Sequence, residues 1–384
     1  MTDLPTLLLA DPDISQDELD AVQAALTSPR LRAGSQVEHF EDEWAARLGR
    51  KQAIAVSSAT LGLVLILKAL ELGTGDEIIT SGFGFRETAA GIALAGCKPV
   101  LADVDYWSGT LAPEKARLCI TENTRAILVG NTNGHPAAWP AFRELAQRHG
   151  LYLIEDSTEA IGSRYLGKTV GTFGDCALFD FSEPSPLTMG EGGMIVTNDA
   201  ALATRIRALR SRRLDERHSV VLNDMFCYRA EISELSAALG RVQLRRLDEI
   251  LARRKQVEAW YQDHVLSFEG IKPPYLAPDV DEAHWMLYLV HLGTRFTRSS
   301  RDAIVQDLAT EAIEACAYSF PLHLQSCYTR LGYRKGDLFV TEKLADRAIA
   351  LPFHGHLTED QIGFIVTTAK DSSVNVGAGA AIYL

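Results

Sequence analysis

A carboxylate and a hydroxyl stand close together where one apolar run of the sequence ends and another begins. The run over residues 176–181 carries Asp180 near its end, and Ser185 follows in a loop that closes with Gly190-Glu191-Gly192-Gly193. A second apolar run begins at Met194, so the segment predicts two short strands joined by a loop. Loops at the ends of buried strands commonly carry functional residues. Ser185 would act there as a hydrogen-bond partner, or as a weak nucleophile if a base stood beside it.

Two more carboxylates follow another apolar run. Asp156 ends an expected strand over residues 152–155, and Glu159 comes three residues later. With Asp180, these side chains predict an acidic pocket that would suit a cationic or polyhydroxylated ligand and supply general acid and base groups. A purely structural interpretation stays open for two of these residues. Asp156 could cap a turn or a helix, and Asp180 could be a polar residue at a strand end turned to solvent.

The segment Ser58-Ala59-Thr60 opens an apolar helix expected to reach Leu72. Helix N-termini bind phosphate through their free backbone N–H groups and the helix dipole. The segment is therefore a candidate anion site, and simple capping of the helix by Ser58 explains it equally well.

The elements that must position these residues alternate along the chain. Expected strands lie at residues 53–56, 77–80, 99–104, 126–129, 152–155, 176–181 and 194–197, with helices at 60–72, 87–95, 139–149 and 200–211 between them. This alternation predicts a mainly parallel sheet covered by helices on both faces. A long amphipathic stretch, 232–265, is expected to connect a large domain (1–250) to a small C-terminal domain (251–384).

Composition excludes several classes of function. The 38 Lys and Arg against 50 Asp and Glu give a net charge of −12, which argues against a nucleic-acid surface. Six scattered cysteines without a Cys-x-x-Cys pair predict neither disulfides nor a zinc site. With no signal peptide and no apolar run long enough for a membrane span, we expect a cytoplasmic protein.

The segment from Phe179 to Gly193 resembles the aldehyde-anchoring segment of the DegT/DnrJ/EryC1/StrS family, sugar aminotransferases that use pyridoxal phosphate (PLP). Other matches follow in the same order over nearly the whole chain: Asp11-Pro12-Asp13, Gly75-Asp76-Glu77, Asp103-Val104-Asp105, Tyr228-Arg229 and Pro321-Leu322-His323. The resemblance implies an aspartate-aminotransferase-like α/β fold (PLP fold type I). Its large domain would hold a mainly parallel seven-stranded sheet, and the small C-terminal domain would be α+β. The resemblance also implies a homodimer with the pocket at the subunit interface.

The same resemblance implies roles for particular residues. Asp156 falls where the family pairs an aspartate with the pyridine nitrogen, and Phe85 where an aromatic ring stacks on the cofactor. Ala59 and Thr60 fall on the segment that binds the cofactor phosphate. Glu159 stands where the family usually has glutamine.

Four positions depart from the family pattern. Ser185 stands at the position of the Schiff-base lysine, and Asp180 at that of a serine that holds the phosphate. Ala59 replaces a glycine of the phosphate cup, and Cys227 an asparagine that reaches the neighbouring subunit's phosphate. A serine has no amine with which to form an imine, and a carboxylate beside a phosphate carries like charge.

Three hypotheses follow. The first is a repurposed, PLP-independent biosynthetic enzyme with no cofactor, acting on a small amine- or sugar-bearing substrate through Asp156, Glu159, Asp180 and Ser185. The second is a lysine-lacking sugar dehydratase or aminotransferase-like enzyme that holds PLP or pyridoxamine phosphate (PMP) without a covalent link. The third is a non-catalytic subunit that forms a heterodimer with an active paralogue.

Overall fold

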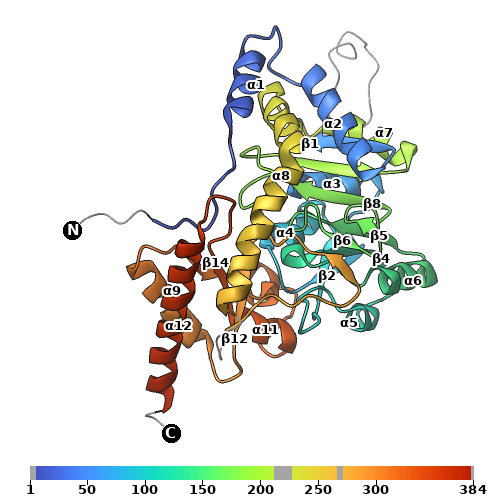
Figure 1. Cartoon of the computed structure of the whole chain (residues 1–384). Helices are drawn as coiled ribbons and strands as arrows, with labels where there is room; N and C mark the ends of the chain where they lie inside the picture. The colour runs from blue at the N-terminus through green and yellow to red at the C-terminus, as the bar shows by residue number, and fades with distance from the viewer. Residues whose placement is uncertain (1–5, 212–226, 266–270, 382–384) are drawn as a thin grey trace, which may run out of the picture.

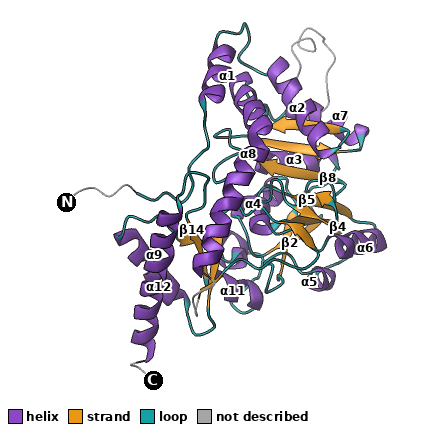
Figure 2. Cartoon of the chain, in the orientation of Figure 1, coloured by secondary structure: helices purple, strands orange, loops and turns teal. Residues whose placement is uncertain are grey.

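The computed structural model describes residues 6–211, 227–265 and 271–381. Its centre is a seven-stranded sheet in the order β1-β9-β8-β5-β4-β2-β3. The strands are β1 (Gln52–Val56), β2 (Glu77–Ser81), β3 (Lys98–Ala102), β4 (Thr124–Gly130), β5 (Tyr152–Asp156), β8 (Cys176–Asp180) and β9 (Gly193–Thr197). The pairs from β3 to β8 are parallel, whereas β9 runs antiparallel to both β1 and β8. The mainly parallel sheet and the paired strands β8 and β9 are thus confirmed (Figures 1 and 2).

Helices cover both faces of this sheet because successive strand residues point to opposite sides. On one face, Ile54, Leu128 and Leu178 pack with residues of α3, α4 and α7. On the other, Phe179 and Val196 pack against α2 and α8, and α6 covers the face of β4 and β5. These helices are α2 (Ser35–Leu48), α3 (Ala59–Ala69), α4 (Arg86–Leu94), α6 (Trp139–His149), α7 (Ala200–Arg210) and α8 (Glu234–Val265).

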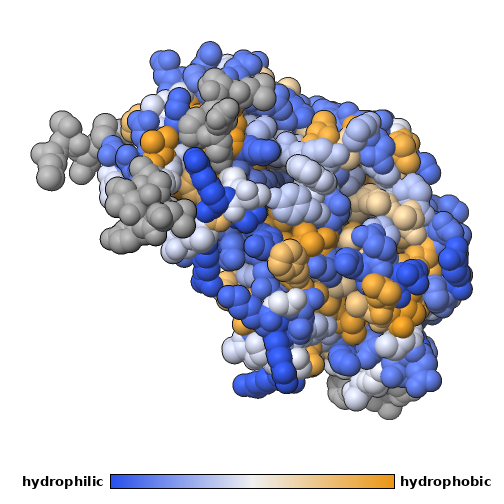
Figure 3. Space-filling model, turned by 90° about the horizontal axis from the view of Figure 1, so that it is seen from below, coloured by the Kyte–Doolittle hydropathy of each residue, from blue (hydrophilic) through white to orange (hydrophobic). Residues whose placement is uncertain are grey.

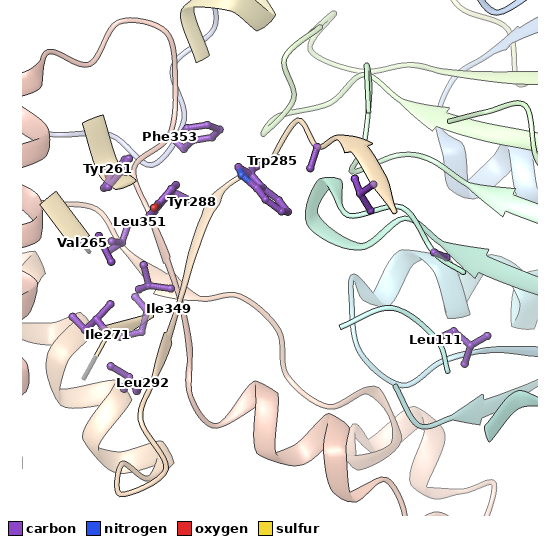
Figure 4. Packing of buried hydrophobic residues seen from close by; sticks show 14 of the residues in the cluster. Leu111, Tyr261, Val265, Ile271, Trp285, Tyr288, Leu292, Ile349, Leu351 and Phe353 are labelled. Atoms are coloured by element: carbon purple, nitrogen blue, oxygen red, sulfur yellow. The ribbon is translucent and has the colours of Figure 1, made fainter. Parts of the chain in front are cut away.

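Helix α8 is 32 residues long and joins the large sheet to the C-terminal part of the chain (Figure 1). Its second half contributes Tyr261 and Val265 to a core shared with a second sheet (Figure 4). That sheet has the order β10-β12-β14-β13, with β10 (Ile271–Lys272), β12 (Tyr288–Leu292), β13 (Cys316–Ala317) and β14 (Ala348–Leu351). The predicted domain boundary at residue 250 lies inside the uninterrupted α8, and the division into two domains stays a prediction.

The remaining elements surround these two sheets. They are α1 (Gln16–Leu26), α5 (Pro113–Leu118), α9 (Arg298–Thr310), α10 (Ser326–Thr329), α11 (Phe339–Ala345), α12 (Glu359–Ala381), and a small sheet of β6 (Arg164–Tyr165), β7 (Lys168–Thr169) and β11 (Val280–Glu282). Short 3-10 helices also span Thr132–Gly134 and Leu322–Leu324. Within the described ranges, no helix combines the length and apolar character needed to cross a bilayer. Hydrophilic residues dominate the face seen from below, with hydrophobic groups between them (Figure 3).

An aromatic cluster beneath β8 fixes the loop that follows this strand. Phe179 and Phe181 point to the same side of the chain, and each lies 5.0 Å, centroid to centroid, from the ring of Trp44 in α2. Phe40 lies 5.6 Å from Phe181. The backbone of Phe181 also accepts a hydrogen bond from Met189 N (2.9 Å), which closes the loop. Because Asp180 stands between the two buried phenylalanines, its side chain points to the opposite face, toward α3.

Candidate functional site

A cavity of about 400 Å³ lies at the carboxyl ends of β5 and β8, beside the N-termini of α3 and α4. Carboxyl ends of parallel strands are the usual place for ligands in open α/β sheets. Six carboxyl side chains are among its lining: Glu87, Asp156, Glu159, Asp180, Glu183 and Glu191. No lysine, arginine or histidine belongs to the lining that the described residues form. The acidic pocket expected from the sequence is therefore present in this chain.

Strand β5 places its two last carboxylates on opposite sides. Glu155 is fully buried and accepts hydrogen bonds from the backbone N–H groups of Phe173 (2.8 Å) and Gly174 (3.0 Å), so it holds the segment before β8. Asp156 faces the cavity instead. The side chain of Glu155 is thus structural, and Asp156 is the member of the pair that is open to the cavity.

Asp156 is held by two threonines. The hydroxyl of Thr88 in α4 donates to one of its oxygens (2.9 Å), and the hydroxyl of Thr158 donates to the other (2.7 Å). Burial raises the pKa of Asp156, the threonine hydrogen bonds oppose this rise, and the negative charge of Asp180 adds to it. A buried carboxyl of this kind is stabilised in its charged form when a cation, such as a protonated ring nitrogen, lies against it.

Glu159 titrates near neutral pH. Burial raises its pKa to about 7, although hydrogen bonds from Tyr318 and from the backbone of Asn133 oppose the rise. The Asn133 N–H donates to Glu159 Oε2 at 2.5 Å, and the Tyr318 hydroxyl donates to the same oxygen. A carboxyl group with such a pKa can both take and give a proton at physiological pH, which is the property required of a general acid or base.

Tyr318 contacts the cavity residue Glu159, and the sequence did not reveal this partner. It follows β13 in the second sheet, and its ring lies 5.9 Å from the ring of Phe85, edge to face. Burial and the neighbouring Glu159 raise the pKa of Tyr318 well above its ordinary value, so the phenol keeps its proton. Because Tyr318 and Glu159 are 159 residues apart, no local pattern could have paired them.

Asp180 binds the N-terminus of α3. Its Oδ2 accepts a hydrogen bond from Ala59 N (2.8 Å), and its Oδ1 accepts one from Ser182 N (2.9 Å). The side chain is half-buried and lines the cavity, so it is not simply turned to solvent. Ser58 also caps α3, because its Oγ accepts from Leu61 N (3.2 Å). The capping interpretation of Ser58 is thus confirmed, whereas a phosphate site at the helix start stays a prediction, because Asp180 accepts the Ala59 N–H bond.

The other predicted site residues lie at different distances from the cavity. Ala59, Thr60 and Phe85 line it. Ser185 does not belong to the lining, and its hydroxyl donates to Leu187 O (2.7 Å) within the loop. Cys227 lies outside the lining as well, with its sulfur 3.6 Å from Arg210 O. The catalytic role assigned to Ser185 and the cofactor-binding roles assigned to Ala59, Thr60 and Phe85 stay predictions.

Pyridoxal phosphate fits one end of this site and not the other. Asp156 offers the carboxylate that a pyridine nitrogen needs, and Phe85 supplies an aromatic ring at the cavity. At the α3 end, however, Asp180 already occupies the Ala59 N–H group. A phosphate placed there would meet a negative charge in the arrangement described.

Comparison with known proteins identifies the relatives of this chain. The model of the "DegT/DnrJ/EryC1/StrS aminotransferase family" matches residues 12–370. A GDP-perosamine synthase of Caulobacter vibrioides is 34% identical over 95% of this chain and 98% of that protein. A dTDP-3-amino-3,4,6-trideoxy-alpha-D-glucose transaminase of Streptomyces venezuelae is 33% identical over 91% of this chain and 90% of that protein. The structure of S. venezuelae DesV in complex with a ketimine intermediate covers 96% of this chain and 99% of its own, with 30% identity and a TM-score of 0.87.

These findings confirm the resemblance and the PLP fold type I, and they correct one expectation. The prediction that the pocket holds no cofactor is wrong, because the relatives are aminotransferases and DesV was solved with a ketimine. Transamination of this kind depends on the pyridoxal group as an electron sink. The expectation rested on Ser185 at the position of the Schiff-base lysine and on the altered phosphate site, and the roles of Ser185 and Asp156 stay predictions.

Proposed function

Because this chain belongs to the DegT/DnrJ/EryC1/StrS aminotransferase family, we propose that it is an enzyme of sugar-amine chemistry that acts on a small amine-bearing sugar. In this proposal a vitamin B6 ring lies against Asp156 without a covalent link to the chain. The observation that carries the proposal is the cavity lining, which combines the buried Asp156 with five further carboxyl groups and offers no basic side chain from the described residues.

The cofactor contributes one property when it is bound, the capacity to withdraw electrons from the substrate carbon. Asp156 would orient the ring by facing its nitrogen, and Phe85 would limit the space above it. Ser185 cannot anchor the ring covalently, since a hydroxyl forms no imine. The ring would then be held only by contacts of the kind that Asp156, Thr88 and Phe85 offer.

Glu159 is the residue best suited to move protons. Its pKa of about 7 makes both protonation states available near neutrality, and Tyr318 holds its carboxyl group in place. In the proposed reaction Glu159 would take a proton from the substrate, or return one to it, at the cavity that Glu159 lines. Such a positioned group contributes about 10²–10⁴-fold to a rate.

The charge of the pocket favours the amine-bearing form of the ligand. An ammonium group would be attracted by Glu183 and Glu191 at the cavity, whereas a phosphate or carboxylate on the ligand would be repelled. A homodimer with the pocket at the subunit interface stays part of the proposal, as does the alternative of a paralogue heterodimer.

The proposal is tested by titrating the protein with an amino sugar, its N-acetylated form and its 6-phosphate in a calorimeter. We expect the free amine to bind at least about tenfold more tightly than the N-acetylated sugar, because acetylation removes the charge that meets the carboxylates. Glu191→Gln is expected to weaken amine binding, and Glu122→Gln, an exposed position outside the cavity, serves as the matched control. Equal binding of the acetylated or phosphorylated sugar would contradict the proposal.

A further inference from the structure

The N-terminus of α3 carries an anion that belongs to the chain itself. Asp180 presents one oxygen to Ala59 N (2.8 Å) and the other to Ser182 N (2.9 Å), and the Ser182 hydroxyl donates to that second oxygen. The carboxylate is therefore held by two backbone N–H groups and one side-chain hydroxyl. These are the kinds of donor that commonly hold a ligand's phosphate at a helix N-terminus.

The backbone around this contact leaves little freedom. A Cβ atom at Gly193 would stand 2.8 Å from Ala59 N, so the first residue of β9 packs directly on the start of α3. Phe179 and Phe181, on either side of Asp180, are buried in the aromatic cluster with Trp44. Asp180 is consequently fixed by its neighbours along the chain, and its carboxylate is part of the built site.

The described residues that line the cavity supply no cation to balance a second anion there. Asp180 shares the cavity lining with Ser182, Glu183 and Glu191, and the lining that the described residues form contains no basic side chain. A phosphate carries a charge of about −1.5 to −2 at neutral pH, and at the α3 N-terminus it would meet the carboxylate of Asp180. A neutral hydroxyl would instead find a hydrogen-bond acceptor in Asp180.

We propose that the carboxylate of Asp180 takes the place of the cofactor phosphate, so that the pocket selects an unphosphorylated B6 ligand. Pyridoxamine is the ligand of this class that best fits the acidic lining: its ring nitrogen faces Asp156, its hydroxymethyl group donates to Asp180, and its ammonium group lies among carboxylates. The inference rests on the proposed function for the placement of the ring at Asp156, and it goes further in naming the form of the ligand.

The test compares the binding of pyridoxamine and PMP, measured by calorimetry on the full chain. The wild type is expected to bind pyridoxamine at least about tenfold more tightly than PMP, since the second ligand brings its phosphate against Asp180. Asp180→Ser frees the α3 N–H group and is expected to raise the affinity for PMP and lower that for pyridoxamine. Asp180→Asn keeps the shape of the side chain and removes its charge, and it is used if the serine variant fails to fold. This variant is also expected to reduce the preference for pyridoxamine over PMP.

Asp199→Ser is the matched control. Asp199 accepts hydrogen bonds from Ala201 N (2.8 Å) and Leu202 N (3.0 Å) at the start of α7, so it plays a similar part at a helix outside this cavity. Its substitution is expected to leave the preference unchanged. A wild type that binds PMP as tightly as pyridoxamine, a preference that survives both Asp180 variants, or a wild type that binds neither ligand would overturn the inference. The amino-sugar titration judges the proposed function separately from each of these outcomes.

Discussion

Replacing Glu159 with glutamine is expected to remove roughly 3 kcal/mol of pH dependence from the stability of this protein. Burial raises the folded-state pKa of Glu159 from 4.5 to about 7. Between these values the folded chain holds a proton that the unfolded chain has lost, so the free energy of unfolding falls as the pH rises through this window. Glutamine does not titrate and can still accept hydrogen bonds from Tyr318 and Asn133. Urea unfolding at pH 5 and pH 8 measures this pH dependence of the free energy of unfolding in the wild type and in the variant.

The control for this experiment is Glu191→Gln, which removes an exposed carboxyl group from the same cavity. The free energy of unfolding of this variant should differ between pH 5 and pH 8 by as much as that of the wild type. If Glu159→Gln also kept that difference, Glu159 would have an ordinary pKa, and its proposed role in proton transfer would lose its basis. With an active preparation, Glu159→Gln is further expected to lower turnover by about 10²–10⁴-fold.

Phe181→Ala is expected to destabilise the chain by about 3–5 kcal/mol. The side chain is fully buried, and it packs against both Trp44 and Phe40 from α2. Alanine would leave a cavity beneath the loop that carries Ser182 and Glu183, and the neighbouring Asp180 would lose part of its support. We therefore expect weaker ligand binding in addition to the loss of stability, which chemical denaturation measures directly.

Phe364→Ala provides the comparison, because Phe364 lies on α12 with 43% of its surface exposed. Its loss should change the free energy of unfolding by less than about 0.5 kcal/mol. Similar effects of the two substitutions would mean that the aromatic cluster under β8 does not stabilise the fold in the way described.

The sheet was predictable because its signals are local. Short apolar runs separated by glycine-rich turns give the strands of the large sheet, and the runs at 176–181 and 194–197 form the pair β8 and β9. The ordered series of family motifs added the fold type, which the strand pattern alone does not specify. The acidic character of the pocket was also predictable, since Asp156, Glu159 and Asp180 all follow or end strands at one edge of the sheet.

The finer features of the site depend on contacts between distant segments. Tyr318 reaches Glu159 from the second sheet, and the contact of Asp180 with Ala59 joins residues 121 positions apart. Periodicity does not encode such pairings. The direction of Ser185, whose hydroxyl bonds to Leu187 O, is likewise set by the loop and not by the residue type. The expectation of no cofactor rested on four substitutions in one pocket, at Ala59, Asp180, Ser185 and Cys227, and the aminotransferase relatives contradict it.

The most direct test of the central claim is to measure B6 binding and the mass of the chain on the same sample. The purified protein is equilibrated with pyridoxamine or with pyridoxal and passed through a desalting column. The absorbance of the eluted protein then gives the amount of bound ligand. The pyridoxal sample is afterwards reduced with borohydride, and its intact mass is measured. We expect one bound ligand per chain after the column, loss of that ligand when the sample is then dialysed, and an unmodified mass after reduction. A chain that binds neither compound, or one that gains a stoichiometric reduced adduct, would contradict the central claim.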